Sequence, residues 1–354
     1  YGVTSVRNMS GYPIHLRWKQ ELSEGQWLGS NLAIGSPVMN GKENSNPMAH
    51  KVASDPGKAR KMVRTYHAEG WDFLKVYTGL NRPVYEAIVD EASKLDFPVA
   101  GHVPYEVVKS DYSLAAAMMT LEHTEEIFQG PLAYAYDEVA VAAIARQLEE
   151  MNATVTPTLM IFDHLTQICR DKQAFVDTLP LQYLNPLMRF VEGRTSGARW
   201  LNADDKTRDA MEKRNTYFQA ITRVLHENGV NLVLGSDAGV IFSIPGISTH
   251  DEITLLQEAG LPNEAILEMA TINAARVLRV DDRLGSIEAG KTADLVMTRS
   301  NPIEDPGALR SPAGVVKNGQ WLGPVELQAL KDSAENPSNA YFTFGRLLEF
   351  LIGG

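Results

Sequence analysis

Four residues whose side chains can serve as metal ligands each follow a short apolar run in this chain. They are Lys75, His102, His123 and Asp237. Two imidazoles and a carboxylate are ligands that suit a divalent cation such as zinc. A lysine fits this set only as an anion: burial lowers its pKa, and the neutral amine can add carbon dioxide to form a carbamate whose oxygens bridge two cations. The pattern therefore predicts a centre of one or two zinc ions with a carbamate on Lys75.

Each of the four residues also has an ordinary structural explanation. Lys75 could close a salt bridge at the mouth of a barrel, and His102 could be a hydrogen-bonded core histidine. His123 has acidic neighbours and could lie in a surface turn, and Asp237 could form a turn or cap a helix. The order Lys, His, His, Asp at four strand ends is hard to produce by chance, which favours the metal centre.

A parallel barrel would bring these residues together, because its strands deliver their carboxyl ends to one mouth. Helical patterns at 83–95 and 105–118 separate the first three strand ends. Seven segments have the composition of barrel strands, namely 3–9, 31–36, 72–77, 98–102, 119–123, 153–158 and 231–236. A TIM-like (β/α)8 barrel needs eight strands. We therefore expect its first strand to be missing from this chain and to precede Tyr1, which leaves the barrel open or patched there.

The sequence pattern divides the chain into three parts. Residues 1–280 alternate strands and helices as a barrel does, except for a helical insertion at about 159–226. At 281–325, turns and short β patterns replace this alternation, which predicts part of a small β-sandwich on the C-terminal side. Residues 326–354 end in an apolar stretch, and we expect this tail to pack on the body.

Composition narrows the classes of partner. The chain has 354 residues and a net charge of −11 without a basic run, which argues against a nucleic-acid partner and for a small-molecule substrate. The single cysteine, Cys169, excludes an internal disulfide, and no run of 18 apolar residues predicts a membrane span. The composition does not choose between the cytoplasm and a bacterial periplasm, and it leaves a homo-oligomer open.

Several motifs together resemble the amidohydrolase superfamily, in the branch related to imidazolonepropionase and the metal-dependent prolidase-like carboxypeptidases. They are Gly-Val-Thr-Ser-Val-Arg-Asn-Met at 2–9, Lys-Val-Tyr-Thr-Gly-Leu at 75–80, Ala-Gly-His-Val-Pro at 100–104, Leu-Glu-His at 121–123, Gly-Ser-Asp-Ala-Gly at 235–239, Thr-Ile-Asn-Ala-Ala-Arg at 271–276, and Gly-Ser-Ile-Glu-Ala-Gly-Lys-Thr-Ala-Asp-Leu-Val at 285–296. The resemblance implies that Lys75 is a carbamylated bridging ligand on the fourth strand. It implies that His102 and His123 are ligands from the fifth and sixth strands, and that Asp237 binds metal and transfers protons.

The implied activity is metal-dependent hydrolysis of an amide-type C–N bond by activated water, in a cyclic amide, an N-acyl amino acid or a dipeptide such as X-Pro. The family's His-x-His motif is a departure: it belongs to the first strand, and no such pair occurs here. The loop histidines His15 and His50 could substitute for it. Two alternatives therefore stay open: an inactive or truncated barrel that acts only in binding, and a lactone or phosphoester hydrolase.

Two further residues are candidates for substrate binding. Tyr77 lies two positions after Lys75 and therefore on the same side of a strand. His250 lies at the start of a helix that follows the last strand. Their ordinary explanations are barrel packing for Tyr77 and a surface position for His250.

Overall fold

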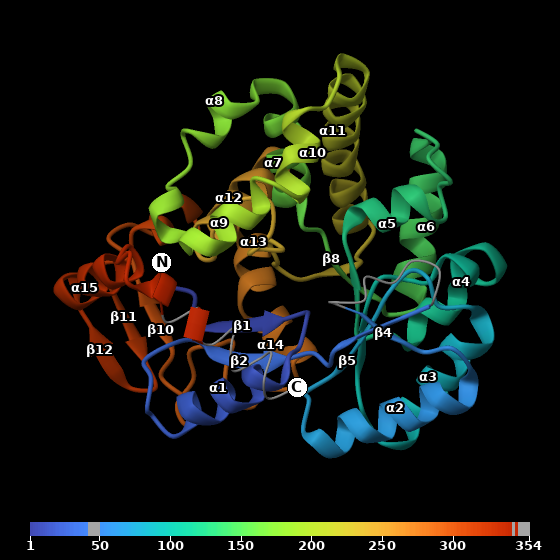
Figure 1. Ribbon diagram of the computed structural model, residues 1–354, viewed down its shortest axis with the longest axis horizontal. Helices are drawn as coiled ribbons and strands as arrows, with labels where there is room; N and C mark the ends of the chain where they lie inside the picture. Colours follow the sequence, from blue (N-terminus) through green and yellow to red (C-terminus); the bar gives the residue numbers. More distant parts are fainter. Residues whose placement is uncertain (42–49, 342–343, 346–354) are drawn as a thin grey trace.

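Strands and helices alternate along most of the computed structural model, which describes residues 1–41, 50–341 and 344–345 (Figure 1). The strands of the main body are β1 (Ser5–Asn8), β2 (Asn31–Ile34), β3 (Val38–Asn40), β4 (His50–Val52), β5 (Leu74–Val76), β6 (Val99–Gly101), β7 (Thr120–Glu122), β8 (Thr154–Thr156) and β9 (Asn231–Leu232). The helices up to β8 are α1 (Pro13–Ser23), α2 (Pro56–Glu69), α3 (Arg82–Lys94), α4 (Tyr105–Ser110), α5 (Thr124–Gln129) and α6 (Glu138–Glu150), with a 3-10 turn, η1, at Tyr112–Ala117.

The main sheet is parallel throughout, in the order β4-β3-β5-β6-β7-β8-β9. Val76 and Val99 lie on its strands β5 and β6, and Val233 extends β9 by bonding to β8. This confirms the predicted α/β fold with a parallel sheet, which is consistent with a TIM-like barrel. The segment predicted as a strand at 31–36 contains β2, and strand β3, which the sequence pattern does not predict, follows directly after Pro37, a residue with no N–H to give to a ladder.

The sheet curls so that distant strands face each other. The parallel pair β1–β2 joins it through a bridge between Gly35 and Phe73. Arg7 on β1 nevertheless reaches Glu122 on β7 at 2.9 Å and Thr156 on β8 at 3.2 Å. A flat sheet would keep these strands several spacings of about 4.8 Å apart. The contact therefore places β1 opposite β7 across the interior of a strongly curved sheet.

The edge of β9 that faces away from β8 forms hydrogen bonds with residues of the helices that follow it in the chain. The N–H of Val233 points toward β8. The carbonyl of Leu232 and the N–H of Leu234 therefore point to the opposite side of β9, away from the sheet. The Leu234 N–H donates to the carbonyl of Met269 at 3.0 Å, and the side chain of Asn273 donates to the carbonyl of Leu232 at 3.3 Å. In the described residues no ladder joins β9 to β1.

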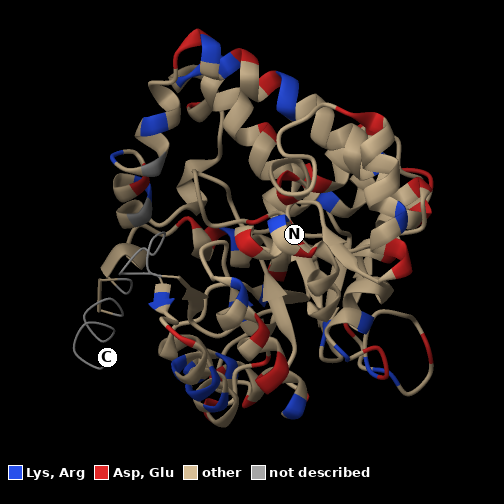
Figure 2. Ribbon diagram, turned by 90° about the vertical axis from the view of Figure 1, so that its right-hand side faces the viewer, with Lys and Arg blue, Asp and Glu red and all other residues tan. Residues whose placement is uncertain are grey.

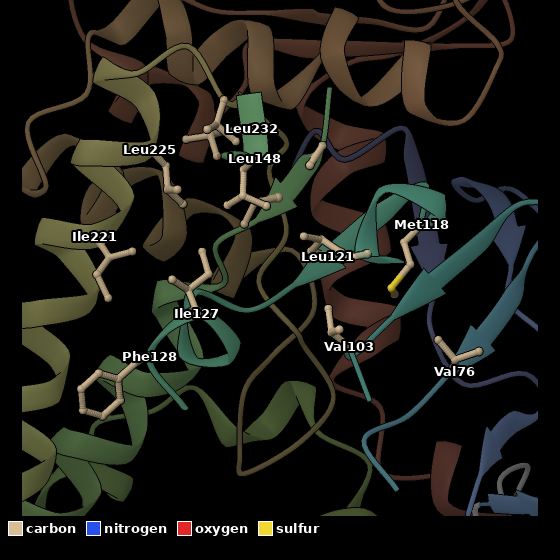
Figure 3. Close-up of a cluster of buried hydrophobic side chains, with 14 of the residues drawn as sticks. Val76, Val103, Met118, Leu121, Ile127, Phe128, Leu148, Ile221, Leu225 and Leu232 are labelled. Carbon is tan, nitrogen blue, oxygen red and sulfur yellow. The ribbon is translucent and has the colours of Figure 1, made fainter. Parts of the chain in front are cut away.

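Helix ends in the barrel follow from local sequence. Asp55 caps α2 by accepting the N–H of Lys58 at 2.8 Å, and Gly70 ends it with a φ of 86°, which only glycine adopts without strain. The apolar faces of the helices cover the sheet: Figure 3 shows Leu121 and Leu232 of the sheet region in one cluster with Leu148, Ile221 and Leu225 of covering helices.

The predicted insertion is helical. It contains α7 (Leu159–Asp171), α8 (Gln173–Val176), a 3-10 turn η2 (Leu181–Tyr183), α9 (Pro186–Glu192), α10 (Ser196–Leu201) and α11 (Asp205–Glu227). It lies at the upper part of the molecule in Figure 1, with α7 packed against α11 and α12 (Ile247–Glu258). Helices α13 (Asn263–Ala270) and α14 (Ile272–Val277) complete the barrel part.

A three-stranded antiparallel sheet follows within the segment predicted as β-sandwich. Its strands are β10 (Leu295–Met297), β11 (Gly314–Lys317) and β12 (Gln320–Leu322), with a 3-10 turn η3 at Pro306–Arg310. A buried network of Asn31, Asp294 and Lys317 ties it to β2, with a Lys317–Asp294 distance of 3.0 Å. Helix α15 (Pro324–Ala334) then returns to the body, where Lys331 lies over the ring of Tyr1. The apolar end of the tail, 347–352, is outside the described residues.

Some local elements differ from the prediction. The helix expected at 105–118 is interrupted at Asp111, whose extended backbone separates α4 from η1. The sequence pattern predicts neither helix α1 nor strand β4, because α1 has no buried residue and β4 is only three residues long. Lys, Arg, Asp and Glu are interspersed along the outer helices in Figure 2. In the described part of the chain, no helix combines the length and apolar character needed to cross a membrane.

Candidate metal-centre residues

Lys75 lies in the middle of β5, only 5% exposed. Burial lowers the pKa of its amine, against the opposing effects of the Glu122 and Asp237 carboxylates. Gly101 on the neighbouring strand makes room for it: a Cβ there would lie 3.1 Å from the Lys75 side chain and 2.2 Å from the carbonyl oxygen of Val76. The fold therefore holds a buried amine that loses its proton more readily than an ordinary lysine, and the neutral amine is the form that adds carbon dioxide.

His102 follows the end of β6 and has a carboxylate partner. Its Nδ1 lies 2.8 Å from Oε1 of Glu126 on α5. Burial holds the pKa of His102 well below its ordinary value, and the nearby charges of Lys75 and His123 lower it further. A neutral imidazole that donates from Nδ1 to Glu126 keeps its lone pair on Nε2. Burial also raises the pKa of Glu126 to about 7.

His123 ends β7 with an unusual backbone, at a φ of 70°. Its Nδ1 lies 2.6 Å from the hydroxyl of Thr158, which follows β8. That hydroxyl also lies 2.8 Å from the carbonyl of Pro157, which can accept its proton. In that arrangement the hydroxyl accepts from Nδ1–H of His123, and Nε2 carries the lone pair that a metal needs.

Aromatic rings extend from the two imidazoles in a row. The ring centroids of His102 and His123 are 4.7 Å apart, and that of Tyr77 is 4.2 Å from His102. His50 continues the row, 4.9 Å from Tyr77. The structure thus places the predicted substrate residue Tyr77 beside the imidazoles, together with His50. His15 is instead engaged at the start of α1, where its Nδ1 accepts the N–H of Tyr12 at 3.2 Å.

Asp237 follows the β9 segment with a φ of 51°, a conformation that Asp tolerates better than most residues. Its side chain is exposed. Its carboxylate raises the pKa of Lys75 and of His102 against the larger effect of burial, so its charge acts on both groups. The four predicted residues thus interact electrostatically at the carboxyl ends of their strands.

His250 is placed differently from the prediction. It lies in the first turns of α12 and is 5% exposed, so the surface explanation is wrong. Its Nε2 lies 2.9 Å from the carbonyl oxygen of Tyr1. Burial lowers the pKa of this imidazole. A role for His250 in substrate binding stays a prediction.

The acidic residues around His123 are buried rather than part of a surface turn. Glu122 is 3% exposed: burial by itself would raise its pKa, but the Arg7 guanidinium and the Lys75 amine hold it below the ordinary value. Arg7 also donates to Thr120 at 2.6 Å. Sequence reasoning missed Glu126, Thr158 and this Arg7 cluster; the position of Glu126, one helical turn after His123, was the available signal.

The donor set fits a divalent metal by its chemistry. Two imidazoles and a carboxylate are ligands that zinc accepts, and a lysine could join them as an anionic carbamate. Among the described residues, no group of three or more His, Cys, Asp or Glu is arranged to hold a metal. Lys75 is not one of these residue types, and its carbamate would be the third anionic or imidazole donor beside His102 and His123.

Comparisons with known proteins bear on the family and the fold of this chain. Bottromycin amidohydrolase has a similar structure, with a TM-score of 0.76 and 28% identity over 94% of this chain and 74% of that chain. A Xaa-Pro dipeptidase solved with bound methionine shares the fold, with a TM-score of 0.64 and 21% identity over 90% of this chain and 75% of that one.

A shorter similarity comes from the 5-methylthioadenosine/S-adenosylhomocysteine deaminase of Teredinibacter turnerae. It is 28% identical over 90 residues, which are 23% of this chain and 20% of that enzyme. The family model gives the broadest match: that of the amidohydrolase family covers residues 1–322. This match spans the barrel part and the three-stranded sheet, so the chain belongs to the amidohydrolase family.

Proposed function

We propose that this protein is a metal-dependent hydrolase that cleaves an amide-type C–N bond in a small molecule. Lys75 as a carbamate, His102, His123 and Asp237 would hold one or two divalent ions, with zinc the metal that best suits the donors. A metal bound there supplies Lewis acidity, which makes water nucleophilic at neutral pH and polarises a substrate carbonyl.

One observation carries the proposal: a buried lysine lies beside two imidazoles whose outer partners leave both Nε2 atoms free. Glu126 and Thr158 hold the Nδ1 atoms of His102 and His123. Carboxylate and hydroxyl partners of this kind orient metal-binding histidines and fix their tautomer. If the two histidines served only in packing, there would be no reason for both rings to use Nδ1 for a hydrogen bond and to keep Nε2 available.

The chain's own residues would divide the remaining work. Asp237 is exposed at the end of its strand, so it can take a proton from the attacking water and pass it to the leaving nitrogen. Tyr77, half-buried beside His102, can contact the substrate. The buried pair Arg7–Glu122 balances charge below Lys75.

An amide is favoured over other C–N bonds by the extent of the similarities. Bottromycin amidohydrolase matches 94% of this chain, whereas the deaminase similarity covers 23%. We therefore propose cyclic amides, N-acyl amino acids and dipeptides such as X-Pro as the substrate classes to test. Hydrolysis of lactones or phosphoesters is the competing outcome.

The test is a substrate panel with the metal-loaded protein, containing members of each amide class, a lactone and a phosphoester. We expect hydrolysis of at least one amide, its loss on treatment with a chelator, and its loss in His102→Ala and His123→Ala. His67→Ala on the outer helix α2 is the control that keeps activity. Turnover that survives both active-site substitutions, or that is confined to the lactone or phosphoester, would contradict the proposal.

A further inference from the structure

The loop that carries Asp237 contains a second strained position. After Asp237, the backbone of Ile241 and Phe242 also has positive φ values, 52° and 61°. A β-branched residue such as Ile rarely adopts this conformation, because it is sterically strained. Such a conformation persists only where the surrounding structure holds it.

Glu192, the last residue of α9, holds this position. Its Oε1 accepts the N–H of Ile241 at 2.9 Å, and its Oε2 accepts the N–H of Phe242. The side chain is 8% exposed, and no basic residue pairs with it in the described part of the chain. One buried carboxylate thus accepts hydrogen bonds from two successive backbone N–H groups; burial raises its pKa, and these two hydrogen bonds oppose that effect.

The side chain of Phe242 anchors the same loop in the insertion. It belongs, with Ile168, Val176 and Leu181, to a small apolar cluster separate from the main core. Gly197 on α10 lies against its ring, where a Cβ would come within 2.6 Å. The helical insertion therefore grips the loop through a polar contact at its backbone and an apolar contact at its side chain.

The loop is fixed on both sides of Asp237. On the strand side, the hydroxyls of Ser236 and Ser248 lie 3.1 Å apart. Only residues 237–240 separate this point from the Glu192 contact, a span of at most ~14 Å when extended. Any release at Glu192 must therefore change where Asp237 can lie.

We infer that Glu192 is a positioning residue: by clamping Ile241 and Phe242 it holds the Asp237 carboxylate toward Lys75 and His102. The inference rests on the proposed function for its catalytic consequence. It gives the insertion a role in the reaction, because α9 and α10 set the place of a proton-transferring group without touching the substrate.

The experiment compares Glu192→Ala and Glu192→Gln with the unsubstituted protein. Ala removes both acceptors, whereas Gln keeps one carbonyl oxygen. The matched control is Asp204→Ala, because Asp204 also lies in the insertion and accepts a backbone N–H, that of Thr207 at 2.8 Å, away from the loop. Amide hydrogen exchange is measured by mass spectrometry, together with kcat, KM and zinc content.

We expect amide exchange at 240–243 to accelerate at least about tenfold in Glu192→Ala and less in Glu192→Gln. In Asp204→Ala, exchange at 240–243 should equal that of the unsubstituted protein. kcat should fall about 10- to 100-fold with KM within about twofold and zinc retained, as expected for a displaced catalytic group. Glu192→Gln should recover part of that loss.

Unchanged exchange at 240–243 would overturn the clamp. Accelerated exchange with normal kcat would also overturn the inference, since Glu192 would then be structural only. If the unsubstituted protein hydrolyses no probe, the proposed function fails, and exchange at 237–239, which Glu192→Ala should also accelerate, still decides whether the clamp positions Asp237.

Discussion

Removing the hydroxyl of Thr158 tests the tautomer argument most sharply. Thr158 is 3% exposed and has a φ of 51°, so the replacement must remain β-branched to keep the backbone comparable. Thr158→Val meets this requirement and removes the hydroxyl that accepts from the His123 Nδ1–H and donates to the carbonyl of Pro157. His123 must then leave a buried donor unpaired or move its proton to Nε2, the nitrogen proposed to bind the metal.

Both responses weaken metal binding. An unpaired buried donor costs about 1–3 kcal/mol. Moving the proton avoids this cost but blocks the lone pair that the metal needs. Loss of an outer partner of a metal-bound histidine typically lowers metal affinity about 10- to 100-fold, which is ~1.4–2.7 kcal/mol.

The assay is titration of the metal-free protein with zinc in competition with a chromophoric chelator. Thr166→Val is the matched control: Thr166 is equally buried in α7, but its hydroxyl donates to the carbonyl of Phe162 at 2.7 Å and touches no imidazole. Thr158→Ser gives up the β-branch but keeps the hydroxyl, so it should bind zinc more tightly than Thr158→Val. Wild-type affinity in Thr158→Val, or an equal loss in Thr166→Val, would refute the reasoning.

Three further substitutions have defined outcomes. Asp237→Asn keeps size but removes basicity, so kcat should fall about 10²–10⁴-fold while most of the zinc is retained; near-normal turnover would remove Asp237 from the mechanism. Gly101→Ala places a Cβ 2.2 Å from a backbone oxygen at a φ of 136°, so the free energy of unfolding measured in urea should fall by more than about 2 kcal/mol. A fall of less than about 1 kcal/mol would count against the packing around Lys75. Burial raises the pKa of Glu252 to about 8, so its contribution to stability is fully present below its ordinary pKa of 4.5 and is lost as the pH rises through 8. Relative to Glu252→Gln, the wild type should therefore lose on the order of 4 kcal/mol of stability between pH 4.5 and pH 9, and parallel stability curves would show that Glu252 does not titrate in this range.

The ligand positions could be predicted because Lys75 lies within its strand and His102 and His123 directly follow theirs. A short apolar run before Lys75, His102 and His123 fixes both the strand and the side of the sheet on which it ends. The structure confirms all three strands, although each is only three residues long. The helical nature of the insertion followed similarly from its length and periodicity.

The partners of those ligands could not be predicted with the same rules. Arg7 and Glu122 are 115 positions apart, and their contact depends on the curl of the sheet rather than on any local pattern. Thr158 acts on His123 only because its backbone is in the left-handed region, which the sequence does not indicate for a threonine. Buried acidic residues beside His123 resembled a surface turn because burial of a carboxylate depends on its distant partners.

The metal content of the purified protein tests the central claim most directly. Plasma emission spectroscopy would be applied to the wild type, Lys75→Ala, His102→Ala, His123→Ala and the control His67→Ala after loading with zinc and bicarbonate. We expect one or two zinc ions per chain in the wild type and in His67→Ala, and substantial loss in the other three. Equal zinc content in all five proteins, or none in the wild type, would contradict the metal centre.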